Sequence, residues 1–175
     1  MQVFPGQWWN AVFEFAHLTR AQGAAIEAFL ARLNGREGTF LLGHPLHSTP
    51  AGVATGAPVV QGGNQSGSSL KTAGWTPNVT GILLAGDHIQ IGSGATARLY
   101  RITADSDSNS SGEAVLEVWP KIRQSPMPSA DGATIITSNP KSVFRLNPDQ
   151  GKNYGLVRLS PPAVYTWTLQ AREAL

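Results

Sequence analysis

The amino-acid sequence predicts a mainly β protein with a single helix. Short apolar segments of alternating polarity recur along the chain, and glycine or proline separates most of them. Glycine occurs 19 times and proline 12 times among 175 residues, which indicates many turns. Only one segment has the spacing of an amphipathic helix, so the crossover helices of a parallel α/β fold are missing. Roughly ten short strands and one helix therefore predict a barrel or a sandwich.

The clearest elements lie near the N-terminus. Residues 8–15 are aromatic and partly alternating, which favours a strand. Residues 19–34 predict an amphipathic helix, because Thr19 and Gln22 can form a capping box and Asn34, followed by glycine, supplies a left-handed stop. Alanines fill much of this segment, and alanine is the strongest helix former. We expect the helix to cover one face of a sheet.

Downstream of the helix the pattern is almost entirely β. The stretch 43–86 contains Lys71 as its only Lys, Arg, Asp or Glu, and its glycine-rich part fits either a flexible linker or a set of short strands. Apolar residues such as Leu70 and Trp75 interrupt it regularly, which favours short strands with glycine turns. Further strands are predicted at 39–42, 87–91, 97–102, 114–119, 134–136, 142–146, 155–159 and 164–169, with Pro120 as a strand stop.

The charge and cysteine content exclude several classes of protein. The 13 Lys and Arg residues and 11 Asp and Glu residues give a formal net charge of +2, and no two basic residues are adjacent. The basic cluster of a dedicated nucleic-acid binder is therefore absent. The lack of cysteine excludes disulfides, a thiol nucleophile and thiolate metal sites. No apolar run approaches the roughly 18 residues of a membrane span, and the N-terminus lacks the parts of a signal peptide, so we expect no membrane insertion.

Two segments imitate ligand-binding motifs. Residues 92–97 (GSGATA) resemble a dinucleotide fingerprint, but a strand pattern follows where that motif needs a helix N-terminus, which favours a hairpin turn. Residues 105–109 (DSDSN) resemble the opening of a calcium loop. Gly112 comes two positions late for that loop, and Leu116 stands where a bidentate acid belongs. A solvated hairpin loop is therefore the better interpretation.

No catalytic or metal constellation can be assembled from local motifs. His44 and His47 are close in sequence, but the glycine and proline beside them exclude a helix, and no acidic third ligand lies nearby. We interpret them as surface histidines of a loop. His17 and His88 are isolated, and no serine stands in a Gly-x-Ser-x-Gly elbow. We therefore expect no enzyme, no cofactor and no metal site, although a triad assembled from distant residues leaves no local motif.

Tryptophan is the remaining candidate for a binding surface. Trp8 and Trp9 are adjacent on a predicted strand, so one is expected to face the core and the other to face outward. An outward tryptophan often marks an interface, which makes this pair a candidate subunit contact. Trp75, Trp119 and Trp167 lie near strand ends, where packing in a core is the usual reason. In an alternative interpretation Trp75 is exposed and contacts a glycan.

The order of elements and two groups of motifs resemble a family of phage proteins. Residues 8–42, which include the segment RLNGREGTF, resemble the distal tail proteins of long-tailed bacteriophages. Residues 84–92 (LAGDHIQIG), followed by LYRI, AVLEVWP and NPK, are similar to a small barrel carried within phage tail proteins. The resemblance implies a tail-tube-like β-sandwich or barrel with one flanking helix and an inserted small β-barrel. It also implies two domains, a ring domain of residues 1–45 plus 146–175 and an insertion of residues 46–145 with a glycine-rich lead-in.

The function that the resemblance implies is assembly. Distal tail proteins form a ring, commonly a hexamer, that joins the tail tube to the hub and fibres of the tip. The expected partners are further copies of the chain, the tail tube protein, the hub and fibre proteins and the tape measure protein, and genomic DNA passes through the lumen without specific binding. Such a protein belongs to the virion tail tip and is assembled in the cytoplasm of the host bacterium. Strand edges that pair with neighbours and a wall without a basic cluster fit this role.

Two other functions remain open at this point. One is a phage-tail module whose inserted barrel binds a cell-surface glycan, which is motivated by the Trp and Gly content of residues 59–119. The other is a tube or terminator subunit, because these proteins share the fold. The insertion argues against a plain tube subunit, which does not need one.

Overall fold

The computed structural model describes residues 7–122, 130–147 and 165–174. The chain divides into two compact units. The smaller contains Trp8–Phe40 and Phe144–Ala174, and the larger contains Leu41–Val143 together with Gln7. The sequence placed the divisions near residues 45 and 146, and the structure places them at 40/41 and 143/144. The smaller unit is therefore built from both ends of the chain, and the larger unit is inserted between them.

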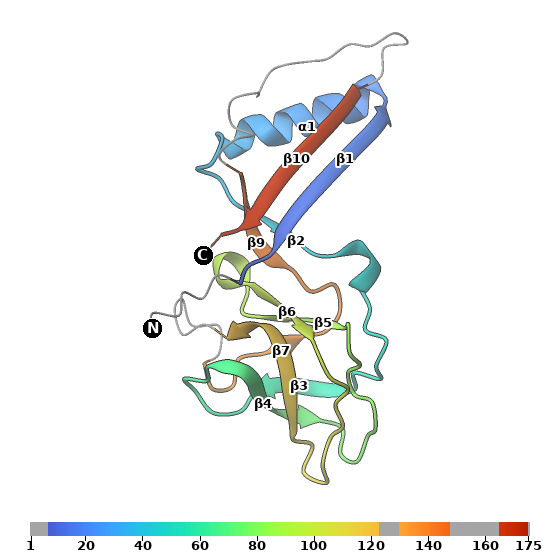
Figure 1. Cartoon of the computed structure of the whole chain (residues 1–175), viewed down its shortest axis with the longest axis vertical. Coiled ribbons are helices and arrows are strands. Elements are labelled where there is room, and N and C mark those ends of the chain that lie inside the picture. Colours follow the sequence, from blue (N-terminus) through green and yellow to red (C-terminus); the bar gives the residue numbers. More distant parts are fainter. Residues whose placement is uncertain (1–6, 123–129, 148–164, 175) are drawn as a thin grey trace. The chain divides into compact units, whose positions relative to one another are not determined.

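The smaller unit is a four-stranded sheet covered on one face by a helix (Figure 1). Its elements are β1 (Asn10–Leu18), α1 (Arg20–Leu33), β2 (Phe40–Leu42), β9 (Ser142–Leu146) and β10 (Tyr165–Glu173), and the strand order is β1-β10-β9-β2. β10 lies antiparallel to both β1 and β9. Leu30 and Leu33 of α1 pack with Leu146 and Leu169 of the sheet, so burial of apolar surface holds the two layers together.

The predicted helix and both of its caps are confirmed. The Thr19 hydroxyl accepts a hydrogen bond from the Gln22 backbone N–H (3.4 Å), and the Gln22 side chain accepts one from the Thr19 N–H (2.9 Å). Asn34 ends α1 in the left-handed conformation, with a φ of 47°. Leu30 and Leu33 are buried while most alanines of α1 are exposed, so the helix is amphipathic as its spacing predicts.

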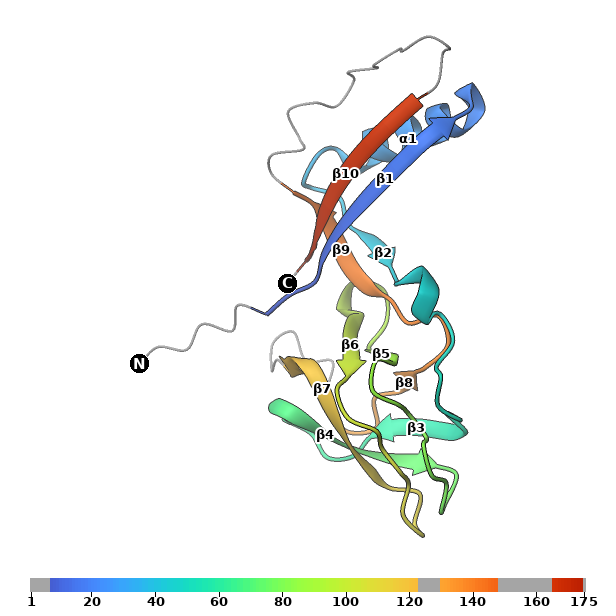
Figure 2. The same cartoon turned by 45° about the vertical axis from the view of Figure 1, so that its right-hand side comes forward.

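The larger unit is a six-stranded antiparallel sheet that forms a nearly closed barrel (Figure 2). Its strands are β3 (Gly56–Val60), β4 (Gly67–Trp75), β5 (His88–Ile91), β6 (Arg98–Ile102), β7 (Ala114–Ile122) and β8 (Ile135–Ile136), in the order β3-β4-β7-β6-β5-β8. A bridge between Val59 and Thr134 joins the two ends of the sheet, and the Val60 N–H donates to the Ala133 carbonyl (2.9 Å). Closure encloses one apolar core, whose fully buried members include Leu70, Ile89, Ile102 and Leu116.

The mainly β class with one helix is confirmed in the described residues, and the stretch 43–86 forms β3 and β4 rather than a linker. One prediction is wrong: Pro120 does not stop a strand, because β7 continues to Ile122. The register between β4 and β7 shifts beyond Glu117, so Pro120 lies where no ladder bond to β4 needs its missing N–H. The strand predicted at 155–159 lies outside the described residues.

Gly112 is a position where the barrel requires glycine. Its φ is +71°, and a Cβ there would meet the Trp75 carbonyl oxygen of β4. We expect Gly112→Ala to lower the free energy of unfolding by about 2–3 kcal/mol, measured by urea denaturation. Gly62→Ala is the control, because Gly62 has a φ of +83° with no atom near its Cβ position, and a loss of about 1 kcal/mol is expected. Equal losses in the two variants would contradict the steric argument.

Candidate functional site

The face of the four-stranded sheet that points away from α1 carries mostly polar side chains, and many of them are exposed. Side chains alternate along β1: Phe13 and Phe15 pack against the core beneath α1, whereas Asn10, Val12 and Glu14 are exposed. Val12 is 61 % exposed, so its side chain faces solvent. The residues of β10 on the same face are Thr168, Gln170 and Arg172.

β1 is also an open edge of this sheet. The Glu173 N–H donates to the Trp9 carbonyl (2.9 Å), so the odd-numbered residues of the β1 segment bond to β10. Bonded and non-bonded positions alternate in an antiparallel ladder, and the backbone groups of Asn10, Val12 and Glu14 therefore point to the opposite side. No described strand pairs with that side. An edge of this length can pair with another chain.

Trp8 and Trp9 lie at the start of this edge. Both side chains are partly exposed, which differs from the expected placement of one in the core, because β1 begins only at Asn10. The Arg172 guanidinium lies over the Trp8 ring, 5.2 Å from its centroid, in a cation–π contact. The Trp9 N–H donates to the Glu173 carboxylate (3.4 Å). The subunit contact predicted for Trp8 and Trp9 stays a prediction.

Trp75 lies in the core of the larger unit. It is 3 % exposed, its indole N–H donates to the Thr72 hydroxyl (2.8 Å), and that hydroxyl donates to the Ala114 carbonyl (2.9 Å). Packing in a core is therefore the correct interpretation of Trp75. The alternative, a glycan contact at Trp75, is wrong because a buried ring offers no free face to a sugar.

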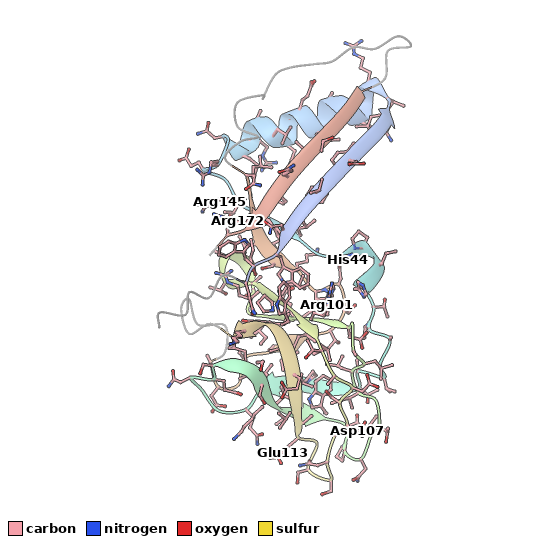
Figure 3. All side chains as sticks on the ribbon, in the orientation of Figure 1. His44, Arg101, Asp107, Glu113, Arg145 and Arg172 are labelled. Atoms are coloured by element: carbon pink, nitrogen blue, oxygen red, sulfur yellow. The ribbon has the colours of Figure 1, made fainter. Side chains whose placement is uncertain are left out.

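Three histidines from two separate segments meet in the larger unit. His44 and His47 come from the short 3-10 helix η1 (Pro45–His47) and its N-cap, and His88 begins β5. The ring centroids lie 4.6 Å apart for His44 and His47, 4.5 Å for His47 and His88, and 5.8 Å for His44 and His88. Arg101 lies opposite His88 on β6 and donates from Nε to His88 Nε2 (3.2 Å); Figure 3 labels Arg101 and His44. The sequence pointed only to His44 and His47.

The surroundings of His88 and His44 favour the neutral form of these imidazoles. His88 is 1 % exposed, and burial, followed by the charges of His47 and Arg101, lowers its pKa to about 4. Burial and the charge of His47 also lower the pKa of His44. In the described ranges no group of three or more His, Asp or Glu side chains has a geometry that could hold a metal ion. Protonation of His88 and of His44 is therefore disfavoured in the folded protein.

The segments that imitate ligand-binding motifs are hairpin connections. Residues 92–97 turn between the antiparallel strands β5 and β6 and contain the 3-10 helix η2 (Gly94–Thr96), which confirms the hairpin interpretation. Residues 105–109 belong to the loop that joins the antiparallel strands β6 and β7, which we call the acidic loop. Within it Asp105 accepts from the Ala85 N–H (2.8 Å) and Asp107 accepts from the Gly81 N–H (2.7 Å). These carboxylates hold neighbouring backbone in place.

An open pocket of about 400 Å³ lies beside the acidic loop. Gln61 and Asn109 both donate to the Glu113 carboxylate, over 2.6 and 2.9 Å. The bond from Asn109, followed by that from Gln61, lowers the pKa of Glu113. The full lining is Gln61, Lys71, Asp107, Asn109, Glu113, Ala114 and Val115. The side chains of Gln61, Asn109 and Glu113 in the pocket lining are thus already hydrogen-bonded to one another.

No protein-family model matches this chain, and no curated protein matches its sequence. None of the helices in the described residues combines the length and the apolar character that a bilayer crossing needs. The open edge of β1 and the polar sheet face beside it are therefore the features on which a function can be based.

Proposed function

We propose that the protein is a structural subunit of a phage tail tip, which forms a ring at the distal end of the tail tube and connects the tube to the hub and fibres. The observation that carries the proposal is the open edge of β1 in a sheet built from both ends of the chain. β1 and β2 both end that sheet without a described neighbour. Head-to-tail pairing of such edges continues the sheet from one copy into the next, and a heterologous contact of this kind closes into a ring where its rotation permits.

The two faces of the sheet support this role. The face that α1 covers is apolar, whereas the outward face carries side chains of both signs, including Glu14 and Arg172. In the proposed ring, the sheet face that points away from α1 lines the lumen, and DNA passes along it. Few phosphate contacts per subunit and charges of both signs let a polyanion pass along this wall without strong retention.

The alternatives are weaker. The glycan-binding module was motivated by the Trp and Gly content of residues 59–119, and Trp75, the contact named for it, is buried. A plain tube subunit has no need of the inserted barrel, which makes up the larger of the two units. In the proposed ring, the inserted barrel contacts partner proteins of the tail tip.

The test is to block the edge of β1 without disturbing the ladder to β10. Val12→Pro removes an N–H that points to the open edge, so the smaller unit should still fold. We expect the unaltered protein to form closed rings with a central hole in negative-stain images, with a matching mass by light scattering. The Val12→Pro variant should be monomeric at the same concentration.

Val12→Thr is the matched control, because it removes the exposed apolar side chain but keeps the backbone N–H and a β-branched residue. It should still form rings. A protein that stays monomeric at high concentration contradicts the self-assembling ring, and rings that persist in Val12→Pro contradict the role of this edge.

A further inference from the structure

Two arginines lie directly opposite each other on the outward face of the four-stranded sheet. Arg145 of β9 is paired with Arg172 of β10, and Figure 3 labels both side chains. Their neighbours Leu146 and Ala171 are buried on the face toward α1, which places both arginines on the other face. Directly opposed like charges destabilise a sheet unless something offsets them.

The described sheet provides little negative charge to offset this pair. Glu14 shares the face, but it lies four residues along β1 from the position opposite Arg172, a distance of about 13 Å. Glu173 is buried on the other face and bonds to the Trp9 N–H. The Arg145 Nε is buried without a hydrogen-bond partner in the described structure. The Arg172 side chain is exposed and Arg145 is partly exposed, and an anion that reaches the terminal amino groups of these guanidinium groups would offset their opposed charges.

The remaining neighbours suit a nucleic-acid strand. The Trp8 ring holds the Arg172 guanidinium from one side, and Asn10 stands opposite Arg172 on β1. Guanidinium groups bind phosphate oxygens through paired N–H donors, and an open sheet face admits a rod-shaped polyanion.

We propose that Arg145 and Arg172 bind the phosphodiester backbone of DNA. The inference rests on the proposed function, because the passage of DNA through a ring supplies a polyanion to this face. Each subunit contributes two phosphate contacts, so its own affinity is weak, and the logarithm of the binding constant should fall against the logarithm of salt concentration with a slope of roughly −1.8. Many copies around a ring would then guide DNA without reading its sequence.

The experiment measures binding of a fluorescent DNA duplex of about 20 base pairs at two salt concentrations. The variants are Val12→Pro alone and Val12→Pro with Arg145→Gln and Arg172→Gln. Because both proteins are monomeric by design, failure of ring formation and failure of DNA binding are distinguishable. We expect the arginine replacements to weaken binding at least tenfold and to remove the salt dependence. Arg36→Gln, the same charge change in the turn after α1, should leave binding unchanged.

Three results would overturn the proposal. One is equal DNA affinity in the double-arginine variant and its parent. Another is a Val12→Pro protein that binds a polyglutamate peptide more tightly than the duplex, which would indicate an acidic protein partner instead. If the double-arginine variant fails to fold, DNA duplex is added to the parent protein and the NMR signal of the Arg145 Nε–H is followed. The third result that would overturn the proposal is a signal that does not change at saturating DNA.

Discussion

Replacement of Asp87 by alanine should cost the protein about 3 kcal/mol or more of its free energy of unfolding, a large part of what a domain of this size possesses. Asp87 is 4 % exposed, and its carboxylate accepts hydrogen bonds from three backbone N–H groups. These come from Ala51 (2.7 Å), Gly52 (3.0 Å) and Leu84 (2.9 Å). Alanine leaves three partly buried donors without acceptors, and each such donor destabilises the fold by about 1–3 kcal/mol.

The measurement is urea denaturation followed by circular dichroism, with Asp105→Ala as the matched control. Asp105 is exposed and accepts one backbone N–H, that of Ala85, so its loss should cost less than about 1 kcal/mol. If both variants lose the same stability, the buried carboxylate of Asp87 does not organise the segments that contact it.

Acid should destabilise the protein through His88. Its folded-state pKa is about 4, whereas an unfolded histidine titrates near its ordinary 6.5. The unfolded chain therefore binds a proton that the folded chain does not, and stability falls as the pH is lowered from about 6.5 toward 4. A difference of this size corresponds to at most about 3 kcal/mol. Burial is the main cause, followed by the charges of His47, Arg101 and His44, and Asp87 opposes them.

The matched variant is His88→Gln, which does not titrate and keeps an acceptor for the Arg101 Nε–H. Unfolding free energies of both proteins are measured from pH 7.5 to pH 4. The unaltered protein should lose stability more steeply below pH 6.5, and the gap between the two curves should grow steadily toward pH 4. Parallel curves would show that carboxylates and the other histidines account for the acid sensitivity.

The helix was predictable because its signals are local. Thr19, Gln22 and Asn34 lie within one or two turns of the ends they define, so their spacing alone fixes the caps. The strands were predictable as a class for the same reason, since alternation is read over a few residues. The prediction that Pro120 stops a strand was wrong because β7 accommodates this proline through its register shift against β4. That shift depends on two strands together and cannot be read from one of them.

The candidate sites depend on pairing between distant segments. His47 of η1 and His88 of β5 are distant in sequence, and their rings come into contact only in the folded chain. Arg101 lies opposite His88 because of the register between β5 and β6. The opposition of Arg145 and Arg172 likewise follows from the register of β9 and β10. A shift of one residue in either ladder would separate these groups, and no single segment specifies that register.

The neighbouring positions of β2 and β9 have a consequence for how the chain can change over time. The polypeptide leaves the smaller unit at β2 and returns to it at β9, and these strands are adjacent in the sheet. The ends of the inserted barrel are thus anchored close together, and the entropy of closing a connection grows only slowly with its length. The barrel can therefore be lengthened, shortened or exchanged as a cassette while the sheet keeps the same strand order. One unit can therefore vary in length and sequence while the other keeps its fold.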